Sequence, residues 1–261
     1  MSLWPCISVV TPVLNAASFI SRCIASVGEQ RYPAIEHIVV DGGSTDETIG
    51  LVRQFPQVNL IQLPGSNQSA AINAGFKLAR GDVVAWLNAD DSYAPGALEY
   101  VGRLFAAEPG LQGLYGDCTV LDLHDQVLWY ETPGVYDFGR LLRNGNYLAQ
   151  PAVFLRKSTL EQVGLLDESL QFGMDYDLWL RLRNRRIDYV PRVLADYRWH
   201  AGSKTAANQF GNWRELLLIV RRYGGGWTPQ LVWSFLLMLL TVSRLRIVHS
   251  RPRRSRGLAG T

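Results

Sequence analysis

The chain has 261 residues, 48% of them hydrophobic, which fits one large α/β domain with or without an appendage. Its formal net charge is only +3. Residues 244–261 hold six arginines and no acidic residue, a charge of +6, which leaves −3 for residues 1–243. The mildly acidic body excludes a strongly basic protein. The basic tail favours an anionic partner, such as a membrane surface or nucleic acid, or is simply a disordered solubilising tail.

The three cysteines, Cys6, Cys23 and Cys118, are odd in number, widely spaced and set in apolar segments. No zinc-binding spacing is present, so we interpret them as small core residues in a reducing compartment. The N-terminus has no basic region followed by a long apolar run, and no signal peptide is expected. These features predict a cytoplasmic protein.

Strands and helices alternate through the first half of the chain. β-branched runs predict the strands, and apolar residues at helical spacing predict the helices between them. The expected order is a strand over 6–12, a helix over 16–30, a strand over 35–41, a helix from about 44, a strand over 58–63, a helix over 68–80 and a strand over 82–88. Ser44 with Glu47 three residues on fits a capping box at the start of the second helix.

This alternation predicts a mostly parallel sheet with helices on both faces. Ligands of such sheets bind beyond the carboxyl ends of the strands. Polar segments follow three of the predicted strands, at residues 11–15, 41–44 and 88–91. We therefore expect one edge of a cleft to collect these three segments.

The segment "NADD" ends in an amide and two carboxylates, Asn88, Asp90 and Asp91. Carboxylate oxygens at a strand end suit Mg²⁺ or Mn²⁺, which keep further positions open for phosphate oxygens. Because Asp90 and Asp91 are adjacent, at most one is expected to bind a metal directly, and the other can cap the helix that begins near Pro95. Asn and Asp are also common in turns, so a plain turn is the alternative here.

The second half has a less regular pattern. Two antiparallel strands are expected over 113–122 and 126–132, a short helix over 136–145, and a strand followed by a helix over 148–164. A further helix is expected over 175–185, with Leu178, Trp179 and Leu182 near one side.

Five motifs in order resemble the family 2 glycosyltransferases, whose fold is the Rossmann-like GT-A fold. The most specific is "VVDGGSTDET", which is similar to the nucleotide-binding turn of that family. The other four are "VVTPVLNAASFI", "QSAAINAGFKLARGDVVAWLNADDSY", "GMDYDLWLRL" and "YRWHAGSKT". The resemblance spans roughly residues 5–205, and it implies an inverting enzyme with a nucleoside-diphosphate sugar donor, a UDP-sugar first, and Mn²⁺ or Mg²⁺.

The resemblance also implies roles for individual residues. Thr11, Pro12 and Asn15 would line the nucleotide pocket together with Gly43 and Ser44 of the turn. Asp41 would accept a hydrogen bond from the base of the nucleotide. Lys204 would neutralise phosphate charge, although a surface lysine is its alternative interpretation.

For the metal, the resemblance implies that Asp90 holds the cation that bridges the diphosphate. His200 matches a late histidine that reaches the metal or the diphosphate, and its alternative is a solvated loop histidine. Asn88 stands where the family often has an aspartate. Its amide can still bond a ribose hydroxyl or coordinate metal through its carbonyl, but it brings no charge.

Asp175 and Asp177 compete for the role of general base. Asp177 lies four residues before Arg181, so the two can pair on the helix surface. Asp175 lies at the expected helix start and matches the base position of the family, while a plain N-cap is its alternative role. Met174 stands where the family often has a glutamate.

Two residues bear on the acceptor. Gln150 can reach an acceptor hydroxyl or can satisfy backbone beside Pro151. Ala195 stands where processive synthases of the family carry the glutamine of a Gln-x-x-Arg-Trp motif. We therefore expect transfer of a single sugar.

The chain is expected to divide into a GT-A domain over 1–222 and a tail over 223–261. The nucleotide-sugar half would cover about 1–115 and the acceptor half about 116–222. Within the tail, residues 231–242 are apolar on all sides, but twelve helical residues span only about 18 Å of a bilayer core of about 30 Å. With the arginines that follow, this segment either lies in an anionic membrane interface or docks on the body or on a second subunit.

The leading hypothesis is a metal-dependent inverting glycosyltransferase of cell-envelope polysaccharide, glycolipid or glycoprotein assembly. Its acceptor would be a saccharide or a lipid-linked molecule, at the cytoplasmic side and with no nucleic-acid partner. A sugar-phosphate nucleotidyltransferase is one alternative, but "TPVLNAASF" lacks the basic residues that grip a triphosphate. A catalytically silent binding domain is the other, which Asn88 and Met174 keep open.

Overall fold

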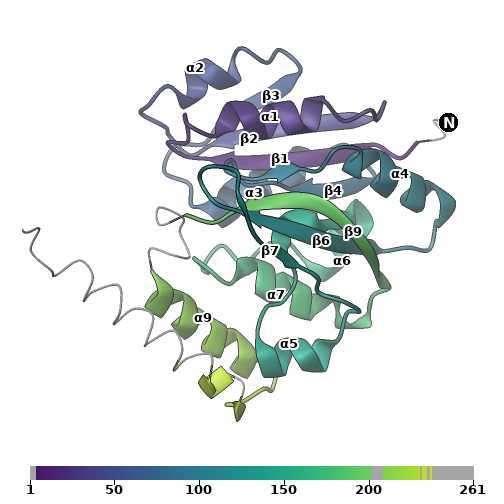
Figure 1. Ribbon diagram of the computed structural model, residues 1–261, viewed down its shortest axis with the longest axis vertical. Coiled ribbons are helices and arrows are strands. Elements are labelled where there is room, and N and C mark those ends of the chain that lie inside the picture. The colour runs from purple at the N-terminus through teal and green to yellow at the C-terminus, as the bar shows by residue number, and fades with distance from the viewer. Residues whose placement is uncertain (1–3, 201–207, 230, 234–235, 237–261) are drawn as a thin grey trace, which may run out of the picture.

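A computed structural model of the chain describes residues 4–200, 208–229, 231–233 and 236 (Figure 1). Within these residues, nine strands form one sheet in the order β3-β2-β1-β4-β8-β6-β9-β5, with β7 paired to β6. The strands are β1 Ile7–Val13, β2 Ile35–Asp41, β3 Val58–Gln62, β4 Val83–Trp86, β5 Ser92–Tyr93, β6 Gly113–Leu121, β7 Val127–Glu131, β8 Val153–Arg156 and β9 Ile187–Arg198.

Helices cover both faces of this sheet. They are α1 Ile20–Gly28, α2 Thr48–Val52, α3 Gln68–Leu78, α4 Ala97–Ala107, α5 Phe138–Asn144, α6 Lys157–Val163, α7 Met174–Arg181 and α9 Gln209–Arg222. Single 3₁₀ turns cover Gln150–Ala152 and Leu182–Asn184. Buried side chains of α1 and α4 pack on one face, and those of α3, α6 and α7 pack on the other. The predicted α/β fold class is therefore confirmed.

The four strands of the first half are all parallel, in the order β3-β2-β1-β4. The chain winds outward from β1 to β3 and then crosses back through α3 to the opposite side of β1. Such a reversal leaves a crevice at the carboxyl ends of β1 and β4. Helix α3 lies directly on β1, because a Cβ added at Gly75 would come within 2.4 Å of the Val10 side chain.

The second half adds antiparallel pairs to this parallel core. Strand β8 pairs antiparallel with both β4 and β6, and β7 pairs antiparallel with β6 as expected. The sequence pattern did not predict the twelve-residue strand β9, which runs parallel to β6. Its register jumps from Val190 to Val193, so Pro191 lies in a bulge, where a missing backbone N–H breaks no ladder bond.

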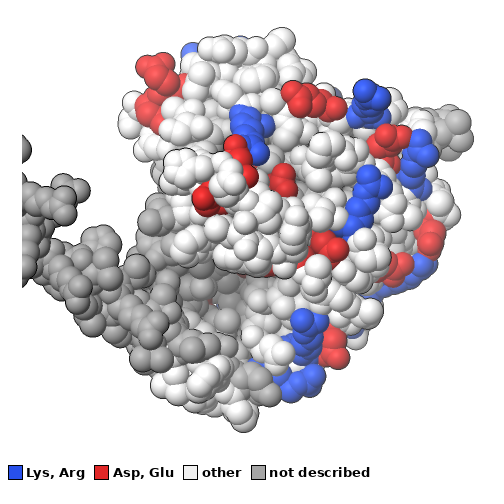
Figure 2. Space-filling view, in the orientation of Figure 1, with Lys and Arg blue, Asp and Glu red and all other residues white. Residues whose placement is uncertain are grey.

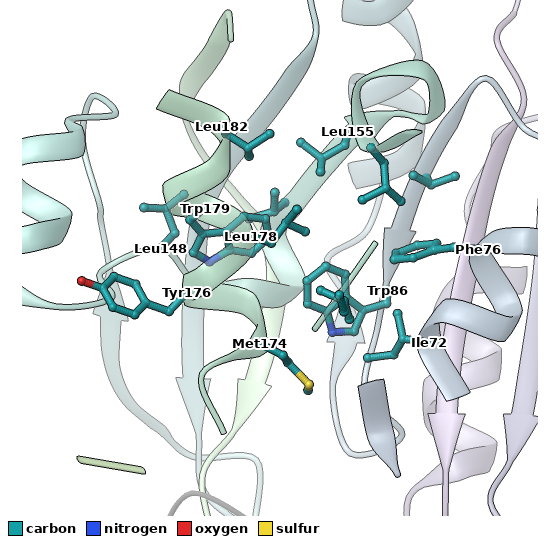
Figure 3. Close-up of a cluster of buried hydrophobic side chains, with 14 of the residues drawn as sticks. Ile72, Phe76, Trp86, Leu148, Leu155, Met174, Tyr176, Leu178, Trp179 and Leu182 are labelled. Atoms are coloured by element: carbon teal, nitrogen blue, oxygen red, sulfur yellow. The ribbon is translucent and has the colours of Figure 1, made fainter. Parts of the chain in front are cut away.

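Helix α7 packs its predicted apolar side against the core. Leu178, Trp179 and Leu182 are fully buried, and the Trp179 ring stacks on Trp86 of β4 with centroids 5.6 Å apart. Figure 3 shows this buried cluster, with Met174 of α7 on the side of Trp86 and Ile72. The stack links the helix to the parallel part of the sheet.

Two expected helix caps are absent. Helix α2 begins only at Thr48, after an N-cap Glu47 without a side-chain hydrogen bond, so the capping-box prediction was wrong. The Ser44 hydroxyl instead accepts the Asn15 N–H. Asp91 does not cap α4, whose N-cap is Gly96.

The remaining predictions have mixed outcomes. All three cysteines carry free thiols; Cys23 and Cys118 are buried and Cys6 is half-buried. Acidic and basic side chains are interspersed on the face drawn in Figure 2. No helix in the described part of the chain is both long and apolar enough to cross a bilayer. Most of the apolar segment 231–242 and all of the arginine-rich tail lie outside the described residues, and the domain division stays a prediction.

Candidate active site

A cavity of about 750 Å³ opens at the carboxyl ends of the parallel strands. Its wall comes from the loop after β1, the loop after β4, the start of α3, residues 146–151 and the segment that leads into α7. This is the crevice that the reversal of strand order creates. We expected the polar segments 11–15, 41–44 and 88–91 to meet at one cleft. Segments 11–15 and 88–91 do line this cavity, whereas 41–44 contributes only Gly42.

The turns after β1 and β2 hold each other in place. Asn15 has a left-handed backbone at φ +50°, and its N–H donates to the Ser44 Oγ at 2.9 Å. Gly43, at φ +106°, makes a turn that few other residues would adopt without strain. Pro12 and Asn15 line the cavity, whereas Gly43 and Ser44 support this wall from behind.

Thr11 and Asp41 do not line the cavity, contrary to expectation. Thr11 is fully buried, and its hydroxyl lies 2.9 Å from His37 Nε2. Asp41 is also fully buried, and its carboxylate accepts the backbone N–H groups of Gly43 and Ser44 at 3.0–3.2 Å. A carboxylate already engaged by two amides fixes the turn, which explains its position without any ligand.

The fold brings together two of the predicted metal ligands. Asp90 and His200 both line the cavity, and the Asp90 Oδ2 lies 3.2 Å from the His200 Nε2. The His200 ring also stacks on Phe19, with centroids 5.4 Å apart, so the solvated-loop alternative for His200 does not hold. Lys204 lies outside the described residues.

The neighbours of Asp90 are used for structure. Both polar atoms of the Asn88 side chain are hydrogen-bonded. Its Oδ1 accepts from Gln68, and its Nδ2 donates to Asp91 and Gln150. Asp91 is buried and also accepts the Arg198 N–H at 2.9 Å. Burial, with the nearby charge of Asp90, raises the pKa of the Asp91 carboxyl. Asp90 is therefore the carboxylate of this motif that faces the cavity.

Of the two roles expected for Gln150, the structure shows the one in which its amide satisfies backbone. Its Nε2 donates to the Trp86 carbonyl at 2.7 Å, and its Oε1 accepts from Asn88. The amide thus ties the end of β4 to the 3₁₀ turn and satisfies backbone, though at Trp86 rather than beside Pro151.

Asp175 and Asp177 have opposite environments on α7. Asp175 lines the cavity, and its carboxylate accepts the Asn146 Nδ2 at 2.8 Å. Burial raises the pKa of Asp175 to about 6, against the opposing effect of its hydrogen bonds. The N-cap of α7 is Gly173, so the N-cap alternative for Asp175 was wrong.

Asp177 is buried rather than paired on the surface. Its carboxylate lies 3.0 Å from both Arg181 and Arg222, and it accepts the Tyr223 hydroxyl. A carboxylate with two cationic partners and a hydroxyl donor is a structural anchor. The geometry therefore separates two residues that the sequence left in competition.

The polar residues of the cavity wall to which sequence reasoning gave no role include Gln68, Glu131, Asn146 and Gln171. Burial raises the pKa of the Glu131 carboxyl, which lies at the end of β7. Gln68 opens one of the five motifs, whereas Glu131, Asn146 and Gln171 belong to none of them. The one available signal concerned Glu131. It follows four large apolar residues of β7, Val127–Tyr130, that are exposed.

The mixed sheet and its covering helices are of the GT-A type. A model of the family described as glycosyl transferase family 2 matches residues 8–162, more than half of the chain. The chain therefore belongs to glycosyltransferase family 2 and is a transferase enzyme.

Three similar proteins illustrate this relationship. The O-antigen biosynthesis protein RfbC of Myxococcus xanthus is 35% identical over 191 residues, which are 70% of this chain and 15% of that protein. S. aureus TarS in complex with UDP-GlcNAc superposes with a TM-score of 0.67 at 19% identity, over 82% of this chain and 65% of that one. The mannosyltransferase PcManGT from Pyrobaculum calidifontis, in complex with GDP-Man and Mn²⁺, gives a TM-score of 0.61 at 19% identity, over 86% and 66%. The chain thus spans less than two thirds of the length of each of these proteins, and the two structural likenesses bear on the fold alone.

Proposed function

We propose that the chain is a metal-dependent, inverting glycosyltransferase that moves one sugar from a nucleoside-diphosphate sugar to an acceptor hydroxyl. The observation that carries this proposal is a single cavity lined by Asp90 and His200, at the end of the parallel sheet, and by Asp175 of α7. Asp90 lies beside His200, a second side chain of a type that binds metals, and burial raises the pKa of Asp175. These are the two requirements of a sugar transfer from a diphosphate donor.

The donor set at Asp90 and His200 fits a divalent cation. No group of three ligand-type side chains is found among the described residues, so the diphosphate oxygens and water would complete the shell, as is usual for Mg²⁺ and Mn²⁺. A cation held by these two residues would act as a Lewis acid toward the leaving diphosphate. The Asn88 amide is held by Gln68, Asp91 and Gln150 and brings no charge, and it is therefore proposed as support rather than ligand.

Asp175 is proposed as the general base. It would take the proton of the acceptor hydroxyl while the hydroxyl oxygen attacks the anomeric carbon and the nucleoside diphosphate leaves. A single displacement inverts the anomeric centre and needs no protein nucleophile. A carboxyl with a pKa of about 6 is ionised at neutral pH but is more basic than an ordinary aspartate, which favours this role.

UDP-sugars are the first donors to test and GDP-mannose the second, because TarS binds UDP-GlcNAc and PcManGT binds GDP-Man with Mn²⁺. The likeness to an O-antigen biosynthesis protein supports a role in surface-polysaccharide assembly. The acceptor is then a saccharide or a lipid-linked saccharide. Pro12 and Asn15 remain the proposed contacts of the nucleotide.

A thermal-shift panel tests the proposal. We expect one class among UDP-sugars and GDP-mannose to raise the melting temperature with Mn²⁺ and much less without it. Asp90→Ala should abolish the metal-dependent part of the shift, because it removes the charged ligand. Glu29→Ala, at an exposed carboxylate at the end of α1, should leave the shift unchanged. A panel without any donor-dependent shift would instead support a silent binding domain.

Peripheral membrane association is proposed for the C-terminal segment. The outward residues of α9, Phe210, Arg214, Leu218 and Arg221, alternate large apolar and cationic side chains, and the chain continues into an apolar run and six arginines. Such a combination suits an anionic lipid surface. Co-sedimentation with vesicles rich in phosphatidylglycerol, but not with neutral vesicles, is expected, and equal binding to both would contradict it.

A further inference from the structure

The loop that leads into α7 is held by a carboxylate from a distant helix. Glu215 of α9 accepts the backbone N–H groups of Gln171, Phe172 and Gly173 at 2.7–3.0 Å. Gln171 and Phe172 line the cavity, and Gly173 is the N-cap of α7. One side chain therefore fixes both part of the cavity wall and the start of the helix that carries Asp175.

These amides need an acceptor from outside α7. Gln171 and Phe172 precede the helix and Gly173 is its N-cap residue, so none of these amides can donate to a carbonyl within α7, and backbone N–H groups left without a partner cost free energy. A carboxylate that accepts several amides forms charge-assisted hydrogen bonds, which are stronger than neutral ones. It also places a negative charge at the positive end of the helix dipole. Glu215 thus fixes, from α9, the three residues that lead into α7.

Close packing keeps α9 against this loop. A Cβ added at Gly173 would come within 2.5 Å of Ile219 Cδ1, and a Cβ added at Gly211 would come within 2.9 Å of the Phe172 ring. Ile219 itself is fully buried. The backbones at Gly173 and Gly211 therefore approach a side chain of the other element with no space to spare.

The C-terminal end of α9 makes a second attachment to α7. Arg222 and Tyr223 both reach the Oδ1 of Asp177, at 3.0 Å each. Asp177 is two residues after Asp175. Helix α9 consequently grips α7 at its N-cap and again one half-turn past the proposed base, so that α7 cannot tilt or slide without breaking charged contacts.

We propose that Glu215 is a positioning residue for Asp175. It fixes the entry loop of α7, and thereby the direction in which the Asp175 carboxylate projects into the cavity. This inference rests on the proposed role of Asp175 as general base. Residue 215 lies beyond the segment 8–162 that the family model matches, so this support belongs to the C-terminal part of the chain.

The test compares Glu215→Ala and Glu215→Gln with Arg214→Ala, a matched control at the exposed neighbouring position on the same helix. The first readout needs no ligand. Hydrogen exchange of the amides at 171–173 should speed up by about tenfold or more in Glu215→Ala, because their acceptor is gone. It should speed up less in Glu215→Gln, which retains one carbonyl oxygen, and should not change in Arg214→Ala.

The second readout uses the donor that the thermal-shift panel identifies. Glu215→Ala should lower kcat by about 10²-fold, the loss that a misplacement of about 1 Å can cause, while the dissociation constant of that donor with Mn²⁺ stays within about twofold. Glu215→Gln should recover part of kcat. A residue needed only for folding would instead lower donor binding and kcat together, in proportion to the unfolded fraction, and that result would overturn the proposal.

The possible failures are distinguishable. Unchanged exchange at 171–173, or faster exchange with unchanged kcat, would overturn the role of Glu215 even if the enzyme is a glycosyltransferase. A wild-type protein that turns over no donor would overturn the proposed function, and the positioning role with it, even if the exchange result is as expected. Glu215→Gln provides the same comparison if Glu215→Ala does not fold.

Discussion

The two ends of the cavity are built in different ways. Asp90 is placed by the end of β4, and its loop is held by neighbours such as Asn88 and Asp91 in the same short segment. Asp175 is placed by contacts with Asn146 and, through its loop, with Glu215, both distant in the chain. The Asp90 end is therefore built on a strand end whose loop is braced by Gln68, Gln150 and Arg198. The Asp175 end instead depends on single side chains that reach the start of a helix, Asn146 and Glu215. We expect substitutions at the Asp175 end to separate binding from turnover more cleanly.

The largest expected effect is at Asp175 itself. Asp175→Asn should keep the affinity for donor and Mn²⁺ and lower kcat by about 10²-fold or more, because the acceptor hydroxyl loses its proton acceptor. Steady-state kinetics with donor titration by calorimetry measures both quantities. This outcome would sharpen the comparison between the two ends of the cavity, because the affinity for donor would be unchanged while kcat falls.

Asp177→Asn is the matched control for this experiment. Its carboxylate is buried between Arg181 and Arg222, so loss of its charge should lower the free energy of unfolding by about 3 kcal/mol, measured by urea denaturation. The turnover of the folded protein should fall far less than in Asp175→Asn, because the proposed base is still present and Glu215 still holds the loop that leads into α7. Loss of turnover in Asp177→Asn with an active Asp175→Asn would mean that the base is assigned to the wrong residue.

A smaller effect is expected in the pH dependence. Because burial raises the pKa of Asp175 to about 6, kcat/KM should fall about tenfold per unit below that pH, where the base becomes protonated. Asn146→Ala removes a donor that stabilises the ionised form. The pKa should then rise further, and the acid limb should move to higher pH by up to about one unit.

The control for the pH experiment is Asn144→Ala, at an exposed asparagine two residues earlier. Its pH profile should match that of the wild type. An acid limb that stays in place in Asn146→Ala, or moves to lower pH, would contradict the assignment of this limb to Asp175.

The sequence predicted the parallel half of the fold well because its signals are local. The apolar runs of β1, β2 and β4 and the apolar stripe of α1 are each visible within about ten residues. Strand β9 was missed because Pro191 and the charged residues around it interrupt the pattern, and its bulge only makes sense beside β6. Local periodicity cannot reveal a strand that is defined by its partner.

The same distinction holds for the site. The order of motifs predicted Asp90, His200 and Asp175, and all three line one cavity. It also suggested Thr11 and Asp41, which the fold uses for internal hydrogen bonds instead. Asn146 and Glu215 could not be predicted, because a single polar side chain that reaches a helix start from 29 or 42 residues away leaves no pattern in the sequence.

The stacked rings of Trp86 and Trp179 have a consequence for how such an enzyme can change. Trp86 lies four residues before Asp90, and Trp179 lies one helical turn after Asp175. The two stacked rings, with centroids 5.6 Å apart, therefore set the distance between β4 and α7. Tightly packed interiors resist compression. The loops around the cavity can therefore vary, while the distance between the end of β4, which precedes Asp90, and α7, which carries Asp175, is fixed by the packed interior.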